Sequence, residues 1–138
     1  MYKRQGFWFE YLGLQSSGHG AQAPIDIRFT DKKSPIAMTL SDWTTMNEEH
    51  YNNVKIFDTA TPLAHGTQMV DGKENDFVIA WTNIYMGKTR VFSTTIGHNN
   101  ETVSDPRYLD LVTNGVLWAT DKLGEDGKPK PGYGPGGK

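Results

Sequence analysis

The sequence predicts an α/β domain, in which helices cover a β-sheet, and three observations lead to this class. Residues 76–85 and 90–95 are rich in β-branched and aromatic side chains, as strands are. Near-continuous apolarity at residues 77–81 indicates a strand covered on both faces. Residues 105–119 repeat apolar side chains at the three-and-four spacing of a helix with one buried stripe. With 138 residues, the chain is long enough for one domain.

The first elements are short. Phe7, Tyr11 and Leu14 recur at helical spacing within residues 6–14, which predicts a short helix that the poor helix former Gly13 weakens. A loop follows. Residues 25–29 alternate apolar and polar side chains, which predicts a strand with one buried face.

The middle of the chain has a weaker pattern. Residues 36–53 lose any period, so we expect a long irregular segment over one edge of the sheet, and long loops are often functional. Residues 54–57 are a strand candidate. Residues 61–75 contain proline and glycine and are predicted to be a connector, with a turn at Asp71 and Gly72.

The strongest signals follow. The strands at residues 76–85 and 90–95 are separated by Met86-Gly87-Lys88, which is typical of a hairpin loop. The Asp105-Pro106 pair supplies the cap and first residue of the final helix. Its predicted buried stripe consists of Tyr108, Leu111, Val112, Gly115, Val116 and Ala119.

The chain ends in a segment rich in glycine and proline. Such a composition buries little apolar surface and favours extended, mobile chain. We therefore divide the sequence into a domain at residues 1–123 and a disordered tail or linker at residues 124–138.

Composition excludes several classes of protein. The net charge is −2, with 14 basic residues scattered among 16 acidic ones, so no basic stripe is available for nucleic acid. The absence of cysteine excludes disulfides, thiolate metal sites and a cysteine nucleophile, and leaves the compartment open between cytoplasmic and exported. The longest apolar runs are too short for a membrane span, so we expect a soluble chain.

Five segments, in this order, resemble the ThuA-like (trehalose utilisation) family: GHGAQAPI, NEEHYN, AWTNIY, GKTRVFSTTIGH and DPRYLDLVTNGVLWA. The resemblance implies a Rossmann-like or flavodoxin-like sheet flanked by helices, the fold of the class I glutamine amidotransferases. It also implies that the opening third of the family's domain is absent, so we expect an N-terminally truncated fragment. Where the family's acidic motif carries an aliphatic residue, this chain has His50.

The best candidate for chemistry is His98, which follows a strand within a Gly-His-Asn-Asn-Glu turn. Ligands of open α/β sheets bind just beyond the carboxyl ends of strands. In the amidotransferases that the family resembles, the equivalent turn carries a general-base histidine with its orienting glutamate two residues on. Here Glu101 lies three residues on, and the cysteine nucleophile is missing, so we expect no amidotransferase activity. A histidine that satisfies backbone groups in a tight turn is the alternative.

Two further residues complete the predicted catalytic set. His19 lies between two glycines, and Glu49 matches the family's acidic position. Together with His98 they are ligand types that a divalent metal such as Zn²⁺ accepts, so these three residues are both catalytic and metal-binding candidates. An exposed loop histidine and a solvated acidic turn are the alternatives for the first two.

Four residues are candidates for binding substrate: Trp81, Asn83, Arg90 and Asn99. Trp81 and Asn83 alternate along one strand face and offer an aromatic and polar surface on which a sugar can stack. Buried packing is the alternative for that face, and a structural ion pair is the alternative for Arg90.

The resemblance implies a protein of carbohydrate utilisation that acts on a disaccharide or an oxidised sugar. A non-catalytic carbohydrate-associated module, tethered to another domain by the tail, is the alternative, and an inactive fragment is a third. The expected partner is a small-molecule carbohydrate, without nucleic acid, with a homo-oligomer or a fused domain left open. Fold analogy alone does not assign a reaction.

Overall fold

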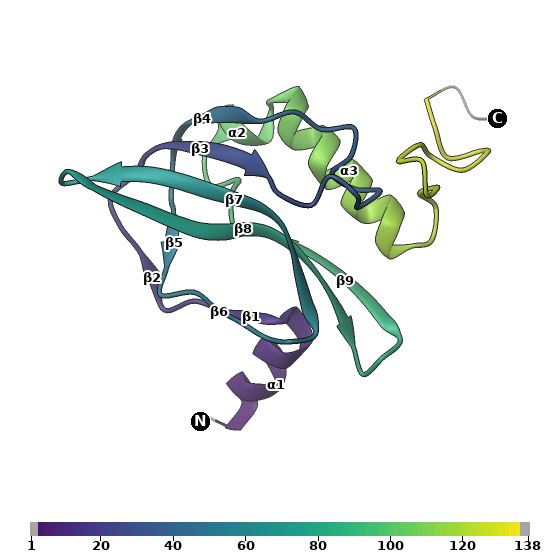
Figure 1. Cartoon of the computed structure of the whole chain (residues 1–138), viewed down its shortest axis with the longest axis horizontal. Helices are drawn as coiled ribbons and strands as arrows, with labels where there is room; N and C mark the ends of the chain where they lie inside the picture. Colours follow the sequence, from purple (N-terminus) through teal and green to yellow (C-terminus); the bar gives the residue numbers. More distant parts are fainter. Residues whose placement is uncertain (1–2, 136–138) are drawn as a thin grey trace.

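An antiparallel sheet of five strands forms the centre of the molecule, in the order β4-β3-β7-β8-β9 (Figure 1). The structure is a computed structural model and describes residues 3–135. The strands of this sheet are β3 (Ala23–Phe29), β4 (Trp43–Glu48), β7 (Ala60–Val70), β8 (Lys73–Tyr85) and β9 (Thr89–Thr94). Two small ladders flank it: β1 (Leu14–Gln15) pairs with β6 (Lys55–Ile56), and β2 (Gly18–His19) pairs with β5 (Tyr51–Asn52).

Tight turns make the central strands antiparallel. Asp71 and Met86 both have a φ of 51°, and Gly72 and Gly87 follow them with φ of 73° and 70°. Two successive positive φ values match the twist of paired strands in a hairpin. The predicted turn at residues 71–72 and the predicted hairpin between the two strongest strands are confirmed, and β8 begins three residues earlier than predicted.

The prediction of a connector at residues 61–75 is wrong, because most of this segment belongs to the long strand β7. Pro62 is accommodated next to a register shift in the ladder with β8, where a proline interrupts no regular hydrogen bond. Gly66 packs directly on the core, since a Cβ atom there would lie 2.6 Å from Cγ2 of Ile25. In the sequence both residues indicate a loop. In the strand, Pro62 lies at a bulge and Gly66 lies in close contact with the core.

The prediction of an irregular segment at residues 36–53 is also wrong in part. Residues 43–48 form β4, which pairs with β3 at the edge of the sheet, and only part of one face is buried. Because β4 is short and mostly polar, its partner strand stabilises it more than its own apolar pattern does. The strand predicted at residues 54–57 shrinks to the two residues of β6, whereas the strand predicted at 25–29 is confirmed within β3.

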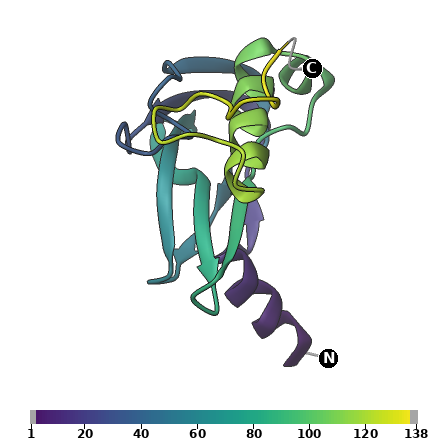
Figure 2. The ribbon, with the colours of Figure 1, turned by 90° about the vertical axis from the view of Figure 1, so that its right-hand side faces the viewer.

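One helix covers one face of the sheet. In Figure 2, α3 (Pro106–Ala119) lies along this face, and α1 (Lys3–Leu12) extends from the opposite end of the molecule. The cap is as predicted: the carboxylate of Asp105 accepts a hydrogen bond from the backbone N–H of Arg107 at 2.8 Å. Beneath α3, the buried core gathers Ile25, Ile27, Phe29, Leu63, Ile79 and Leu111. Val116, placed on the buried stripe by the sequence, is 54% exposed.

The remaining helical segments are short. The helix predicted at residues 6–14 is confirmed as α1, which ends where Gly13 adopts a φ of 79°. The one-turn helix α2 (Asn100–Val103) was not predicted, and it joins the end of β9 to α3. No helix among residues 3–135 is long and apolar enough to cross a lipid bilayer.

The described part of the glycine- and proline-rich segment folds back on the end of α3. Leu123 is buried and pairs with Pro129 in an isolated bridge, and the N–H of Lys130 donates to the carbonyl of Lys122 at 2.8 Å. Gly127 lies against the Met38 side chain. Residues 124–135 are therefore a series of hydrogen-bonded turns, and the division of the chain after residue 123 stays a prediction.

Candidate functional site

Two histidines converge on one carboxylate at one end of the sheet. Glu49 follows β4, His19 lies on β2, and His98 follows β9. Oε1 of Glu49 lies 3.6 Å from Nε2 of His19 and 3.4 Å from Nδ1 of His98. The side chain of Glu49 is 13% exposed, against 39% for His19 and 49% for His98. Residues separated by up to 79 positions are thus brought together, as the predicted catalytic set requires.

The two histidines differ in how their ring nitrogens are used. Nδ1 of His98 faces Glu49, which leaves Nε2 as the nitrogen available to a substrate. A carboxylate against Nδ1 of a histidine fixes the tautomer and orientation of the ring, and the other nitrogen then exchanges protons. Nδ1 of His19 donates to the carbonyl of Gly20 at 2.9 Å, so its Nε2 is directed at the carboxylate. Glu101, weighed in the sequence as the partner of His98, is exposed on α2.

A buried carboxylate holds the His98 turn in place. Glu48 is the last residue of β4 and is fully buried. Its Oε2 accepts the backbone N–H of His98, and its Oε1 accepts that of Asn99, both at 3.1 Å. The N–H of Glu49 also approaches Oε2, at 3.3 Å. Glu48 therefore ties the turn that carries His98 to the strand end that carries Glu49.

The same bonds explain the ionisation of Glu48. Burial by itself raises the pKa of this carboxyl, but the nearby hydroxyl of Thr102 and the hydrogen bonds from the backbone N–H groups of Asn99, His98 and Glu49 outweigh it and hold the pKa below its usual value. Glu48 is thus a buried carboxylate ion. Sequence reasoning mentioned it only as the neighbour of Glu49, because nothing in the pattern of residues 43–48 tells which of two adjacent glutamates is buried.

Among residues 3–135, the side chains of His19, Glu49 and His98 do not form a preformed metal site. Within residues 3–135, no group of three histidine, cysteine, aspartate or glutamate side chains is arranged to hold a metal ion. His19 and His98 each face Glu49 directly, at 3.6 and 3.4 Å. We therefore derive no step through a metal, and the assignment of these residues as metal ligands stays a prediction.

The four predicted substrate-binding residues do not share one location. The indole of Trp81 is 3% exposed and donates to the carbonyl of Leu12 at 2.7 Å. Asn83 is 1% exposed, and its amide donates to two carbonyls in the last turn of α1. Arg90 pairs with Asp121 at 3.2 Å, at the opposite end of β9 from His98.

Asn99 adjoins the catalytic candidates. Its side-chain amide donates to the backbone carbonyl of Asn47 and to Oε1 of Gln22 at 3.3 Å, so this amide helps to close the His98 turn. Of the four residues, Asn99 therefore lies in the His98 turn, whereas Trp81 and Asn83 support the end of α1 and Arg90 supports the end of α3.

A cleft of about 530 Å³ lies between β5, β9 and α3, and His19, Glu49 and His98 are not among the residues that line it. Its lining comes from the end of α1, β5, β8, β9 and α3: Leu12, Tyr51, Trp81, Phe92, Ser93, Thr94, Thr95, Tyr108 and Val112. The ring of Tyr51 lies 5.4 Å from the ring of His19. Of these residues only Trp81 was predicted to bind substrate, because the others come from separate elements.

His50, the departure from the family's pattern, belongs to the core. Its side chain is 3% exposed and lies 5.4 Å, centroid to centroid, from the ring of Phe77. Burial lowers the pKa of His50, against smaller raising effects of Asp76 and of backbone carbonyls, so the ring is neutral at pH 7. It packs as an aliphatic or aromatic residue would and does not face the cleft.

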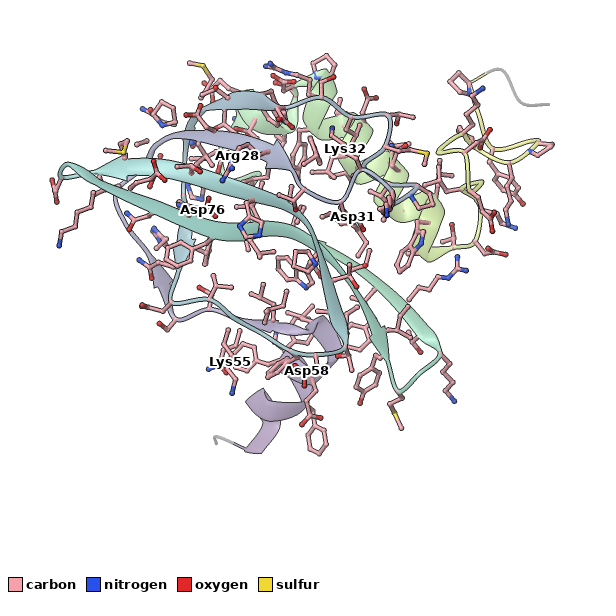
Figure 3. All side chains as sticks on the ribbon, viewed as in Figure 1. Arg28, Asp31, Lys32, Lys55, Asp58 and Asp76 are labelled. Carbon is pink, nitrogen blue, oxygen red and sulfur yellow. The ribbon has the colours of Figure 1, made fainter. Side chains whose placement is uncertain are left out.

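The face of the sheet opposite α3 carries a separate polar cluster. Figure 3 shows Arg28 of β3 and Asp76 of β8 directed at one another across β7. Asp76 also accepts from Nδ1 of His65 at 2.6 Å and from the hydroxyl of Thr67 at 3.3 Å. Burial raises the pKa of Asp76, but His65 and Arg28 outweigh it and lower the pKa. The cluster links three neighbouring strands.

Comparison with known proteins gives a consistent result. The family model described as ThuA, trehalose utilisation, matches residues 1–119. The crystal structure of a ThuA-like protein from Parabacteroides merdae superposes with a TM-score of 0.62 and 23% identity, covering 80% of this chain and 42% of that one. The crystal structure of a ThuA-like protein from Bacteroides uniformis superposes with a TM-score of 0.63 and 16% identity, covering 86% of this chain and 52% of that one. No curated protein matches the sequence.

These likenesses confirm the predicted fold class, an α/β fold of the flavodoxin-like or glutamine amidotransferase-like kind. The part of it seen in residues 3–135 has a curled sheet whose paired strands are antiparallel. The chain spans about half the length of the solved proteins it matches.

Proposed function

The chain belongs to the ThuA (trehalose utilisation) family, and we propose that its Glu49–His98 pair performs acid–base chemistry on a carbohydrate derivative. One observation carries the proposal: Nδ1 of His98 faces a mostly buried carboxylate at 3.4 Å while its other nitrogen stays available. The substrate class comes from the family's description. No amidotransferase activity is proposed, because the chain contains no cysteine.

In this proposal each residue has a distinct part. Nε2 of His98 takes a proton from, or gives one to, a carbon or hydroxyl of the sugar, and Glu49 orients the ring. His19 approaches the same carboxylate oxygen at 3.6 Å, so it either completes the positioning of Glu49 or acts as a second acid. The distances exceed a normal hydrogen bond, and catalytic bonds of this kind commonly tighten when substrate binds.

The test is a comparison of variants in one activity assay. Trehalose, glucose and oxidised forms of both are incubated with the purified chain, and conversion is followed by NMR. His98→Ala should lower kcat by about 100-fold or more, the usual contribution of a general acid or base, while sugar affinity changes little. Glu49→Gln should lower kcat less. Unchanged turnover in both variants would refute the assignment of the site.

A carbohydrate-binding module without turnover is the second candidate. The aromatic and hydroxyl-bearing cleft beside the pair favours it. The same experiment separates the two, since a binding module retains sugar affinity and has no conversion for His98→Ala to abolish. Metal content, measured by mass spectrometry on wild type, His19→Ala and His98→Ala, tests the predicted metal ligands: one equivalent lost in both variants would support them.

A further inference from the structure

We propose that the cleft between β9, β5 and α3 is the sugar-binding site and that it selects uncharged sugars over sugar phosphates and sugar acids. The inference rests on the proposed function, since it assigns a ligand class to the region beside Glu49 and His98. It assigns residues that the sequence did not suggest, in particular Thr95 and Tyr108.

The cleft has the size and the lining of a small-molecule site. Its volume of about 530 Å³ lies within the range of roughly 300–1,000 Å³ that is typical of ligand pockets. The partly exposed rings of Tyr51, Phe92 and Tyr108 offer apolar surface, against which the C–H face of a pyranose packs. Hydroxyl groups from β9 supply polar partners for the rim of such a ring.

The cleft adjoins both histidines. Tyr51 joins it to His19, through the ring contact at 5.4 Å. At the other side, a Cβ atom on Gly97 would lie 2.5 Å from the hydroxyl of Tyr108, so this hydroxyl lies against the residue that precedes His98. Gly97 has a φ of 112°, a conformation that favours glycine. A sugar in the cleft therefore sits next to the proposed base.

Two hydroxyls are left for a ligand. Oγ1 of Thr95 is buried and has no hydrogen-bond partner within the described residues, and a buried hydroxyl without a partner is costly. The neighbouring Thr94 differs, since its hydroxyl donates to the carbonyl of Ile79 at 2.9 Å. Burial raises the pKa of Tyr108, and the charge of Glu48 raises it further, so the phenol keeps its proton and can donate.

Charge distribution excludes anionic ligands. None of the residues that line the cleft is charged. The carboxylates of Glu48 and Glu49 lie nearby and repel an anion, and the two neighbouring histidines each face Glu49. Sites that bind phosphate or carboxylate use arginine or lysine, because an anion taken from water needs a paired charge. Here Arg90, the candidate clamp, is engaged with Asp121 at the opposite end of β9.

The experiment measures binding of four probes to the purified chain by calorimetry: trehalose and methyl glucoside, which are uncharged, and glucose 6-phosphate and glucuronate, which are anionic. We expect the uncharged pair to bind at least about tenfold more tightly at pH 7.5, because the anions have no cationic partner in the cleft. Equal or tighter binding of the anionic sugars, or no binding of trehalose and methyl glucoside, would overturn the proposal.

Variants then locate the site. Thr95→Val and Tyr108→Phe each remove one hydroxyl at nearly constant shape and should weaken binding of the uncharged sugar about three- to tenfold. Matched controls are Thr67→Val and Tyr85→Phe, which remove the same groups outside the cleft and should leave affinity unchanged. Thermal unfolding confirms that each variant is folded. Wild-type affinity in both cleft variants would refute the assignment.

The result also separates this inference from the proposed function. If Thr95→Val and Tyr108→Phe weaken binding while His98→Ala leaves turnover intact, the cleft is the binding site and the acid–base assignment fails. If His98→Ala abolishes turnover while the cleft variants bind sugar normally, the acid–base site stands and the cleft assignment fails.

Discussion

Replacing Glu48 by glutamine tests whether this buried carboxylate holds the His98 turn. The carboxylate accepts N–H groups on both oxygens, from His98 and Asn99 at 3.1 Å. Glutamine has nearly the same shape but only one acceptor oxygen, so at least one of these N–H groups would face an NH₂ group. A hydrogen bond to a charged acceptor contributes about 1.5–3 kcal/mol, and glutamine regains part of the cost of burying a charge.

From these terms we expect Glu48→Gln to lower the free energy of unfolding by about 2–4 kcal/mol. For a domain of this size that corresponds to a fall in Tm of about 6–12 °C. The measurement is thermal unfolding followed by circular dichroism at pH 7.5. Glu49→Gln is the matched control: its carboxylate is partly exposed and faces only histidines, so we expect a small change in Tm together with a loss of turnover.

The difference between wild type and Glu48→Gln should also depend on pH. The pKa of Glu48 in the folded chain is lower than its usual value of 4.5, so the stabilisation is complete above that pH and is lost as the pH falls through the folded pKa. The gap in Tm should therefore narrow below about pH 4.5. A Tm of Glu48→Gln within about 2 °C of wild type at pH 7.5, or a gap that does not change on acidification, would refute the reasoning.

Two further substitutions test Gly97, which precedes His98, and Asn83, which contacts the end of α1. Gly97→Ala should displace the His98 turn, because its Cβ would lie 2.5 Å from the hydroxyl of Tyr108 and its φ is 112°. We expect the free energy of unfolding to fall by about 2 kcal/mol and turnover to be lost. The control Gly72→Ala, which has open space around it, should lower the free energy of unfolding by about 1 kcal/mol and keep normal turnover. Equal effects of the two glycine variants would contradict this. Asn83→Ala removes the amide that binds the carbonyls of Glu10 and Tyr11, so hydrogen exchange in α1 should accelerate more than in α3; uniform exchange would show that Asn83 does not anchor α1.

The sequence alone predicted the elements whose signal is local. The cap at Asp105 and the turn at residues 71–72 depend on neighbours within a few positions and are confirmed, and the predicted buried stripe of α3 holds except at Val116, which is exposed. Strand β7 was missed because its signal is not local. Its proline and glycine indicate a loop when read locally, whereas pairing with β3 and β8 places one at a register shift and the other against Ile25.

For the site, the sequence supplied the residue types and the tertiary structure supplied their partners. His19, Glu49 and His98 were predicted from their turns and from a family resemblance. Their separation along the chain does not tell how far apart they lie in space. The antiparallel pairing of β3 with β4 and the ladder of β2 with β5 decide that they meet. The burial of Glu48 rather than Glu49 was likewise decided by the turn that docks on it. A hydrogen bond between residues 50 positions apart leaves no periodic trace in a sequence, because periodicity records only which face of an element is buried.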